Sequence, residues 1–298
     1  MTKKGIGGLI LNVMKRFAWL LEPVLIIAGI LLVSAGSGLF ETQSLSFASY
    51  GQTFLGMWGD LSHPFDLVYT ITQTERPLFP IILLALWSSM RILFLAIAIS
   101  LGASLILLII YTVSGRIVKN VIKSVAAVLE SVPDIFVIAT LQLFIIWFFK
   151  KTGILLGDVA SLDPNEIIFL PAVTLSVLPT FFFLGLMISF VKEEENLPYV
   201  ELARSKGLTK YRILFIHMIR NILVSLTYHG KQIVWMMLSN LLILEYLYNV
   251  FGVTSFLFTY NTPAIFAITS ILLFLPIYGV LKAMQFMVKY RIGKEMSL

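Results

Sequence analysis

Long apolar runs, separated by short stretches of charged and turn-forming residues, set the pattern of this sequence. Each run has about the length, roughly 20 residues, that one helix needs to cross the hydrocarbon core of a membrane. The runs predict six membrane-spanning helices, at Phe17–Phe40, Ile92–Val113, Val132–Phe149, Ile167–Val191, Ile222–Tyr248 and Pro263–Val288. The expected fold class is therefore all-α, in a polytopic membrane protein.

The apolar run that contains the second span is longer than one crossing requires, and Arg91 interrupts it. Pro80–Met90 is therefore expected to extend outside the bilayer. Loops and short interfacial helices are expected between the first two spans. The chain is thus divided into a cytosolic N-terminus (1–16), a first span (17–40), an extracytoplasmic segment (41–79), a core with spans two to six (80–288) and a cytosolic C-terminus (289–298).

Composition supports a membrane protein and indicates its orientation. Hydrophobic residues make up 58% of the chain and charged residues 13%, which excludes a soluble domain. Most of the 22 Lys and Arg residues fall before the first span, within 116–123, within 192–220 and after the last span. Such positively charged segments stay in the cytosol, so both termini are expected there. The net charge of +6 therefore reflects topology rather than nucleic-acid binding.

Two further features limit the possibilities. The first apolar run could instead be a cleaved signal peptide, but its apolar core would be unusually long, so we expect a retained helix. The chain has no cysteine, which excludes disulfides, thiolate metal sites and a cysteine nucleophile.

A polar stretch, PYVELARSKGLTKYRILFIHMIRN (198–221), lies between two apolar spans. Pro198 suits the first position of a helix, and Asn196 lies near its expected cap. Gly207 can take the left-handed conformation that ends a helix, with Leu208 folding back on the last turn. The stretch therefore predicts a short helix outside the bilayer, hinged at Gly207 to a long helix that crosses it.

This stretch resembles a known family signature. Ala203–Leu208 reads ARSKGL, and His217 and Arg220-Asn221 follow at the matching offset. The run is similar to the cytoplasmic signature of the membrane subunits of binding-protein-dependent ABC importers, in the dipeptide, oligopeptide and nickel permease branch, B-type subunit. The resemblance implies a type I ABC importer permease fold, in which residues 198–208 form a coupling helix that docks in a groove of a cytosolic ATPase.

A small Ala203 and a Gly207 without a side chain suit the close approach of two backbones that such docking requires. The alternative is an ordinary connecting loop with a basic surface that faces the membrane. The resemblance assigns coupling to the ATPase to Glu201, Ala203, Arg204, Lys206, Gly207 and Leu208.

The resemblance extends from about residue 80 to residue 288. Glu245–Gly252, EYLYNVFG, is similar to the family's outer turn, except that Phe251 stands in place of the usual proline and Thr254 in place of a common glycine. The N-terminal outer segment is shorter than in the family, and the Asp-Pro-Arg tail is absent. These departures leave the class intact but weaken any inference about the substrate.

The implied function is a permease subunit that forms half of the translocation path of an ATP-driven importer of oligopeptides or dipeptides. The implied partners are a second, distinct permease subunit, two ATPase subunits and an extracytoplasmic binding lipoprotein, in the bacterial plasma membrane. No G-x-x-x-x-G-K-[ST] phosphate loop occurs in the chain. ATP and Mg²⁺ are therefore expected on the partner subunits, and this chain is expected to hold no cofactor or metal and to be no enzyme by itself.

Ionisable residues inside a predicted span usually face the interior of the helix bundle, because exposure to lipid is unfavourable. Lys231 lies about ten residues, or about 15 Å, beyond Asn221 and therefore near the middle of the bilayer. His229 and Gln232 lie close to it in sequence. We expect these residues to line the translocation path or, as an equal alternative, Lys231 to form a structural ion pair between subunits.

Arg91 and Glu245 lie near the outer ends of their spans and are expected to pair or to gate the path there, although Arg91 can equally reach the lipid headgroups. Asp134 is expected to cap the inner end of the third span. The three histidines lie on distant segments and are not expected to form a metal site.

Two other functional classes remain open from the sequence. A secondary transporter or channel would use the intramembrane charges without any ATPase. A diverged, non-transporting membrane scaffold would tolerate replacement of Lys231.

Overall fold

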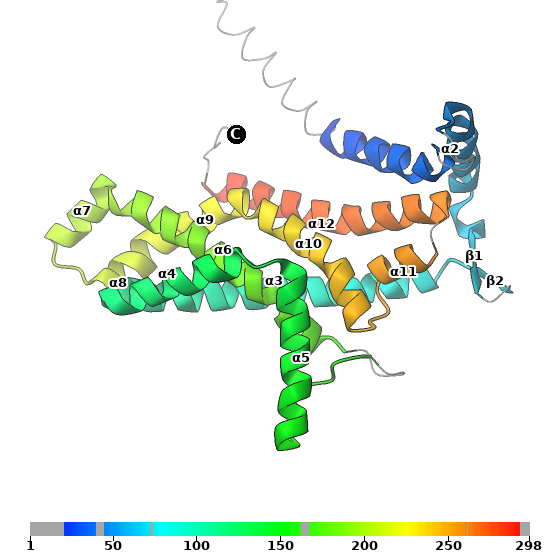
Figure 1. Ribbon diagram of the computed structural model, residues 1–298. Coiled ribbons are helices and arrows are strands. Elements are labelled where there is room, and N and C mark those ends of the chain that lie inside the picture. Colours follow the sequence, from blue (N-terminus) through cyan, green and yellow to red (C-terminus); the bar gives the residue numbers. More distant parts are fainter. Residues whose placement is uncertain (1–20, 40–44, 72–73, 162–166, 261, 293–298) are drawn as a thin grey trace, which may run out of the picture. The chain divides into compact units, whose positions relative to one another are not determined.

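The computed structural model describes residues 21–39, 45–71, 74–161, 167–260 and 262–292, and helices dominate these residues, as the sequence predicts (Figure 1). The predicted cytosolic N-terminus (1–16), the start of the first span and residues 293–298 lie outside them. After the helix Leu21–Leu39, which ends in η1 (Ala35–Leu39), the elements are α2 (Phe47–Ser62), η2 (Pro64–Asp66), β1 (Val68–Ile71), β2 (Thr74–Pro77), α3 (Ile81–Val113), α4 (Arg116–Glu130), α5 (Asp134–Thr152), α6 (Phe169–Glu195), α7 (Pro198–Ser205), α8 (Lys210–Arg212), η3 (Ile213–Met218), α9 (Ile219–His229), α10 (Lys231–Leu247), α11 (Val253–Thr259) and α12 (Pro263–Ile292).

Within the described residues, the helices that are long and apolar enough to cross a membrane are Leu21–Leu39, α3, α5, α6 and the part of α12 at Pro263–Val288. The predicted fifth span is divided: α9 has 11 residues, α10 has 17, and the two helices meet at Gly230. α3 is one continuous helix of 33 residues, about 50 Å long, so Arg91 does not interrupt it.

The chain divides into two compact units, of which the first comprises residues 1–83 and 256–276. In its described part, Leu21–Leu39 packs against α2, around a core of Ala35, Met57, Ala264 and Ala267. The Ser46 hydroxyl begins α2 by accepting a hydrogen bond of 3.2 Å from the Ser49 amide. A helix of 16 residues therefore lies in the segment from which the sequence predicts only loops and short helices.

An antiparallel hairpin of β1 and β2 follows α2 in the same unit. Tyr69 on β1 is buried, and its ring lies 5.2 Å from that of Phe256 and 4.8 Å from that of Tyr260. The sequence does not predict this hairpin, because strands of four residues are too short for an alternating pattern to be recognised.

The second unit comprises residues 84–255 and 277–298, and α6 is its central helix. α4, α5, α7, α9 and α10 all contact α6. Accordingly, 56% of its most apolar segment is buried, against 17–33% in the other candidate spans of the described residues. Most of the other helices of this unit therefore pack against α6.

α4 replaces part of what the sequence predicts to be a cytosolic turn. It is an amphipathic helix of 15 residues that runs back along α6. The Glu130 carboxyl group, at its end, lies 3.6 Å from the position of a Cβ on Gly185. Gly185 is about ten residues, or about 15 Å, from the last residue of α6. The end of α4 thus lies beside the second half of α6.

α5 leaves the other helices of this unit at a steep angle (Figure 1). The side-chain amide of Gln142 holds α5 in place by donating to the carbonyls of Val159 (2.8 Å) and Leu247 (2.9 Å). Asp134 is the first residue of α5, so it lies at the beginning of this candidate span, as the sequence predicts. There it lines a small cavity together with Thr174 and Pro179 of α6.

Candidate functional site

The predicted short helix is present as α7, and both of its ends have a local cause. Pro198 occupies its first turn, as predicted. At the other end Gly207 has φ +76°, and its amide donates to the Arg204 carbonyl (2.9 Å) while the Leu208 amide donates to the Ala203 carbonyl (3.2 Å). These two bonds form a Schellman motif and confirm the predicted helix end.

The residues assigned to coupling occupy two different faces of α7. Ala203 is 4% exposed and Val200 is fully buried, and α7 packs on η3 through this face. Glu201 and Lys206 are exposed, and Leu202 is 56% exposed despite its apolar side chain. α7 therefore presents an outward face that combines charged groups with one apolar side chain.

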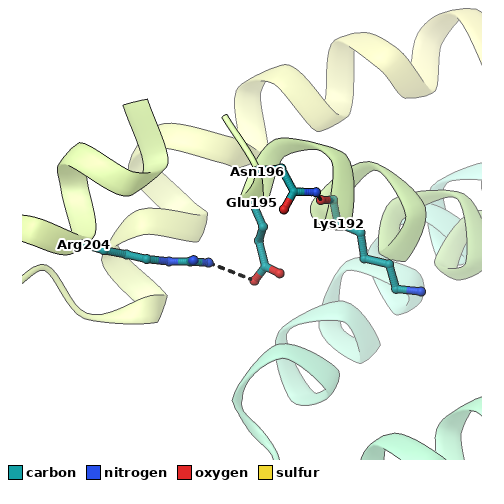
Figure 2. A network of polar contacts seen from close by, with 4 residues as sticks. All are labelled: Lys192, Glu195, Asn196 and Arg204. Carbon is teal, nitrogen blue, oxygen red and sulfur yellow. Dashed lines mark hydrogen bonds and ion pairs between the residues drawn. The ribbon is translucent and has the colours of Figure 1, made fainter. Parts of the chain in front are cut away.

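Figure 2 shows the junction between α6 and α7. The Arg204 guanidinium lies 3.6 Å from the Glu195 carboxyl group, and the Lys192 side chain extends away from this pair. Asn196 lies next to the start of α7, as predicted, but its side chain donates back to the Lys192 carbonyl (3.0 Å) and ends α6. The residue that precedes α7 is Leu197, whose side chain cannot form a capping hydrogen bond.

Asn221 on α9 joins three elements near this junction. Its side-chain amide donates to the Glu194 carboxyl group at the end of α6 (3.2 Å) and to the Tyr199 hydroxyl in the first turn of α7 (3.3 Å). The sequence indicates Asn221 only as part of the family signature. Its two hydrogen bonds connect α9 to the end of α6 and to the first turn of α7.

The predicted path residues lie around the break between α9 and α10. Lys231 is half-buried at the start of α10, Gln232 is exposed, and the exposed His229 lies with its ring 5.4 Å from that of Phe190. A Cβ on Gly230 would lie 2.7 Å from the Leu226 carbonyl oxygen and 3.1 Å from the Phe183 ring. The glycine thus allows close approach to α6 at this level.

Gly230→Ala is expected to lower stability by about 1–2 kcal/mol, because overpacking against Phe183 outweighs the gain in helix propensity of about 1 kcal/mol. Gly279→Ala is the matched control, since nothing lies within 4 Å of its Cβ position in α12. It should leave stability unchanged or raise it. Thermal unfolding of the purified protein compares the two, and equal melting temperatures would contradict the close contact at Gly230.

Glu245 is fully buried and holds a corner of the second unit. Ser89 donates its hydroxyl proton to one carboxyl oxygen (2.5 Å), and the amides of Thr254 and Ser255 donate to the other, both at 3.0 Å. The Thr254 hydroxyl donates to that oxygen too. A Cβ on Gly252 would overlap the same carboxyl group, which explains the glycine at this position. Glu245 thus anchors the start of α11.

Arg91, the residue proposed to act with Glu245, lies half-buried on α3 with its guanidinium 5.9 Å from the centre of the Trp87 ring. Such a cation–π contact stabilises an arginine near an interface. The prediction that Arg91 and Glu245 pair or gate the path stays a prediction.

A polar cluster that the sequence does not predict lies between α5, α6 and α10. Asn240 donates its side-chain amide to the Asp134 carboxyl group (2.5 Å). Thr174 forms a hydrogen bond of 2.8 Å with the Tyr248 hydroxyl. A small cavity, with about the room that one water molecule needs, is lined by Asp134, Asn240, Thr174 and Pro179 among others. Asp134 is therefore a partner of Asn240 rather than a helix cap.

One signal could have indicated this cluster. Asn240 is a lone amide in the apolar run WMMLSNLLILE, where an unpaired polar group would be unfavourable. Its partner, 106 residues away in sequence, could not be identified from that run. Within the described residues, no three His, Asp or Glu side chains lie close enough to hold a metal ion.

Comparison with known proteins places this geometry in a family. The chain resembles an amino acid ABC transporter crystallised with histidines, with a TM-score of 0.52, 17% identity, and 71% of this chain and 94% of that chain covered. It also resembles the MetNI methionine ABC transporter in inward-facing conformations, with a TM-score of 0.50, 16% identity, and 70% and 96% covered.

At these identities the two structures establish the fold, which is that of type I ABC importer permeases. A comparison with curated protein sequences finds no match. Residues 97–293, more than half of the chain, match the family described as binding-protein-dependent transport system inner membrane component. The chain therefore belongs to this family of ABC importer permeases.

Proposed function

We propose that this chain forms half of the translocation path of an ATP-driven importer and that α7 is its coupling helix. The observation that supports this proposal is the form of α7, which is short, packed through Val200 and Ala203, and sharply ended at Gly207. Its outward face then carries Glu201, Leu202 and Lys206. A helix held rigidly while it exposes a mixed face suits docking to another protein better than an ordinary loop does.

The proposed partners are a second, homologous permease, two ATPase subunits that bind ATP and Mg²⁺, and an extracytoplasmic binding lipoprotein. The proposed location is the bacterial plasma membrane, with both termini in the cytosol. This orientation rests on the positively charged segments that flank the predicted spans.

The proposed substrates are dipeptides or oligopeptides, on the strength of the signature ARSKGL at Ala203–Leu208 with His217 and Asn221. Free amino acids are a second candidate, because both similar solved structures are named as amino acid or methionine transporters. Uptake of labelled trialanine and of labelled methionine by cells that do or do not produce the complex distinguishes these substrates.

Purification in a mild detergent, with mass identification of the proteins that accompany this chain, tests the proposal as a whole. Two ATPase chains and a second permease are the expected result. Reproducible recovery of this chain alone and folded would instead support a secondary transporter, a channel or a membrane scaffold.

We further propose that Lys231, His229 and Gln232 line the path, with Arg91 and Glu245 toward its outer end. Lys231→Met is expected to change the rate or the substrate preference of uptake, because it removes a charge near the middle of the bilayer. Uptake kinetics and the amount of purified complex are measured together. Loss of the complex without a change in the remaining kinetics would indicate a structural ion pair instead.

A further inference from the structure

We infer that Asn221 is a positioning residue of the importer, whose side-chain amide holds α7 to the end of α6 and to α9. Movement of α7 is then passed to α9. The inference rests on the proposed role of α7 as the coupling helix. The inference goes beyond that role because it names Asn221 as the residue that joins α7 to α6 and α9.

Both hydrogens of the Asn221 side-chain amide nitrogen have acceptors. A side-chain amide nitrogen carries two hydrogens, and here they meet two acceptors on two different elements, Glu194 on α6 and Tyr199 on α7. Because Glu194 carries a charge, its bond is of the stronger, charge-assisted kind. An aliphatic side chain at position 221 could make neither bond.

Apart from the apolar contact with η3, few side-chain bonds connect the ends of α7 to the rest of the unit. Leu197, before α7, provides no side-chain cap, and α7 ends in the backbone hydrogen bonds around Gly207. The ion pair of Glu195 with Arg204 is 45% and 53% exposed, and exposed pairs contribute little. Without Asn221, α7 could pivot about its two ends while keeping its apolar contact with η3.

Helix α9, on which Asn221 lies, is suited to transmit a movement of α7. α9 is an uninterrupted helix of 11 residues between the π-helical segment η3 and the break at Gly230. Helices transmit displacement along their axis, whereas π-helical turns and glycine breaks allow bending. Asn221 lies in the first turn of α9, and so it attaches α7 to the rigid part.

The absence of cysteine from the chain permits a direct test. Spin labels at Ser205→Cys on α7 and Leu223→Cys on α9 report the distance between the two helices in the complete complex, before and after trapping with ATP and vanadate. The expected result is a narrow, unchanged distance distribution in the parent protein. Asn221→Leu is expected to broaden it.

Transport provides the second readout. With trialanine as the probe, Asn221→Leu is expected to reduce uptake per ATP hydrolysed by about five-fold, because two exposed hydrogen bonds at the low end of the usual range are lost in the coupled state. Hydrolysis itself should continue. A residue that only supports the fold would reduce uptake and hydrolysis together and leave their ratio unchanged.

Two further variants make the test specific. The double variant Glu194→Gln, Asn221→Asp exchanges donor and acceptor, because the new amide at position 194 can donate to the carboxyl group at position 221. This variant should restore the narrow distribution of distances between α7 and α9. Asn196→Ala is the matched control, since its amide bonds only within α6. It should change neither readout.

The inference would be overturned if Asn221→Leu kept both a narrow distribution of distances between α7 and α9 and an unchanged ratio of uptake to ATP hydrolysis. If that variant fails to assemble, the combination of Glu194→Ala and Tyr199→Phe, which removes both acceptors, decides in the same way. Absence of ATPase subunits from the parent complex contradicts the proposed function instead. The distance between α7 and α9 can be measured even then, so the two failures are distinguishable.

Discussion

Replacing Glu245 by alanine is expected to lower the free energy of unfolding by about 3–5 kcal/mol, because it leaves several buried donors without an acceptor. These donors are the Ser89 hydroxyl and the amides of Thr254 and Ser255. The lost side chain also leaves a cavity in a fully buried position, which adds to the effect. Thermal unfolding of the purified protein and its amount in the membrane measure this.

Glu245→Gln is the informative companion. Its amide oxygen can still accept from Thr254 and Ser255, while its amide nitrogen can donate to Ser89, whose hydroxyl then turns to the Ala85 carbonyl at 3.1 Å. Most of the stability should remain. Glu75→Ala, on the exposed strand β2, controls for the loss of a carboxyl group as such. A melting temperature of Glu245→Ala equal to that of the parent protein would refute the anchoring role.

Gly207→Trp is expected to abolish uptake while the protein stays folded in the membrane. Gly207 is exposed, and outside its chain neighbours no atom lies within 4 Å of its Cβ position, so a side chain there starts in open space. The left-handed backbone adds a penalty of only about 1–2 kcal/mol. An indole ring at this point would separate α7 from an ATPase that approaches closely.

Gly207→Asn is the matched control, because asparagine tolerates the left-handed conformation and is much smaller than tryptophan. It should retain substantially more uptake. Substrate uptake, the amount of chain in the membrane and the amount of ATPase that copurifies are measured for both variants. Normal uptake by Gly207→Trp would show that α7 does not dock on an ATPase.

Features that depend on neighbouring residues could be predicted from the sequence. The ends of α7 follow from Pro198 and Gly207, whose backbone preferences act locally. The apolar runs likewise predict five of the spans and the all-α fold, since each run carries its own signal of length and hydropathy. The resemblance in Ala203–Leu208 correctly indicates an ABC importer permease.

Features that depend on distant partners could not be predicted. The hydrogen bonds of Glu245 could not be derived from its own span, because its donor Ser89 lies 156 residues away in the sequence. The charges of α4 suggest a cytosolic turn, whereas the helix gains its position by packing along α6. The hydrogen bond between Asp134 and Asn240 joins residues 106 positions apart. The glycine at position 230 likewise leaves room for the ring of Phe183 on another helix.

The division of one span into α9 and α10 has a consequence for how the chain is inserted during synthesis. The two helices are about 16 Å and 25 Å long, so neither alone reaches across a hydrocarbon core of about 30 Å. Lys231, where they meet, adds a penalty of roughly 2.5–3.5 kcal/mol for entering lipid at that depth. This segment is therefore a poor substrate for independent insertion. It should leave the translocon only together with α6, the helix against which it packs.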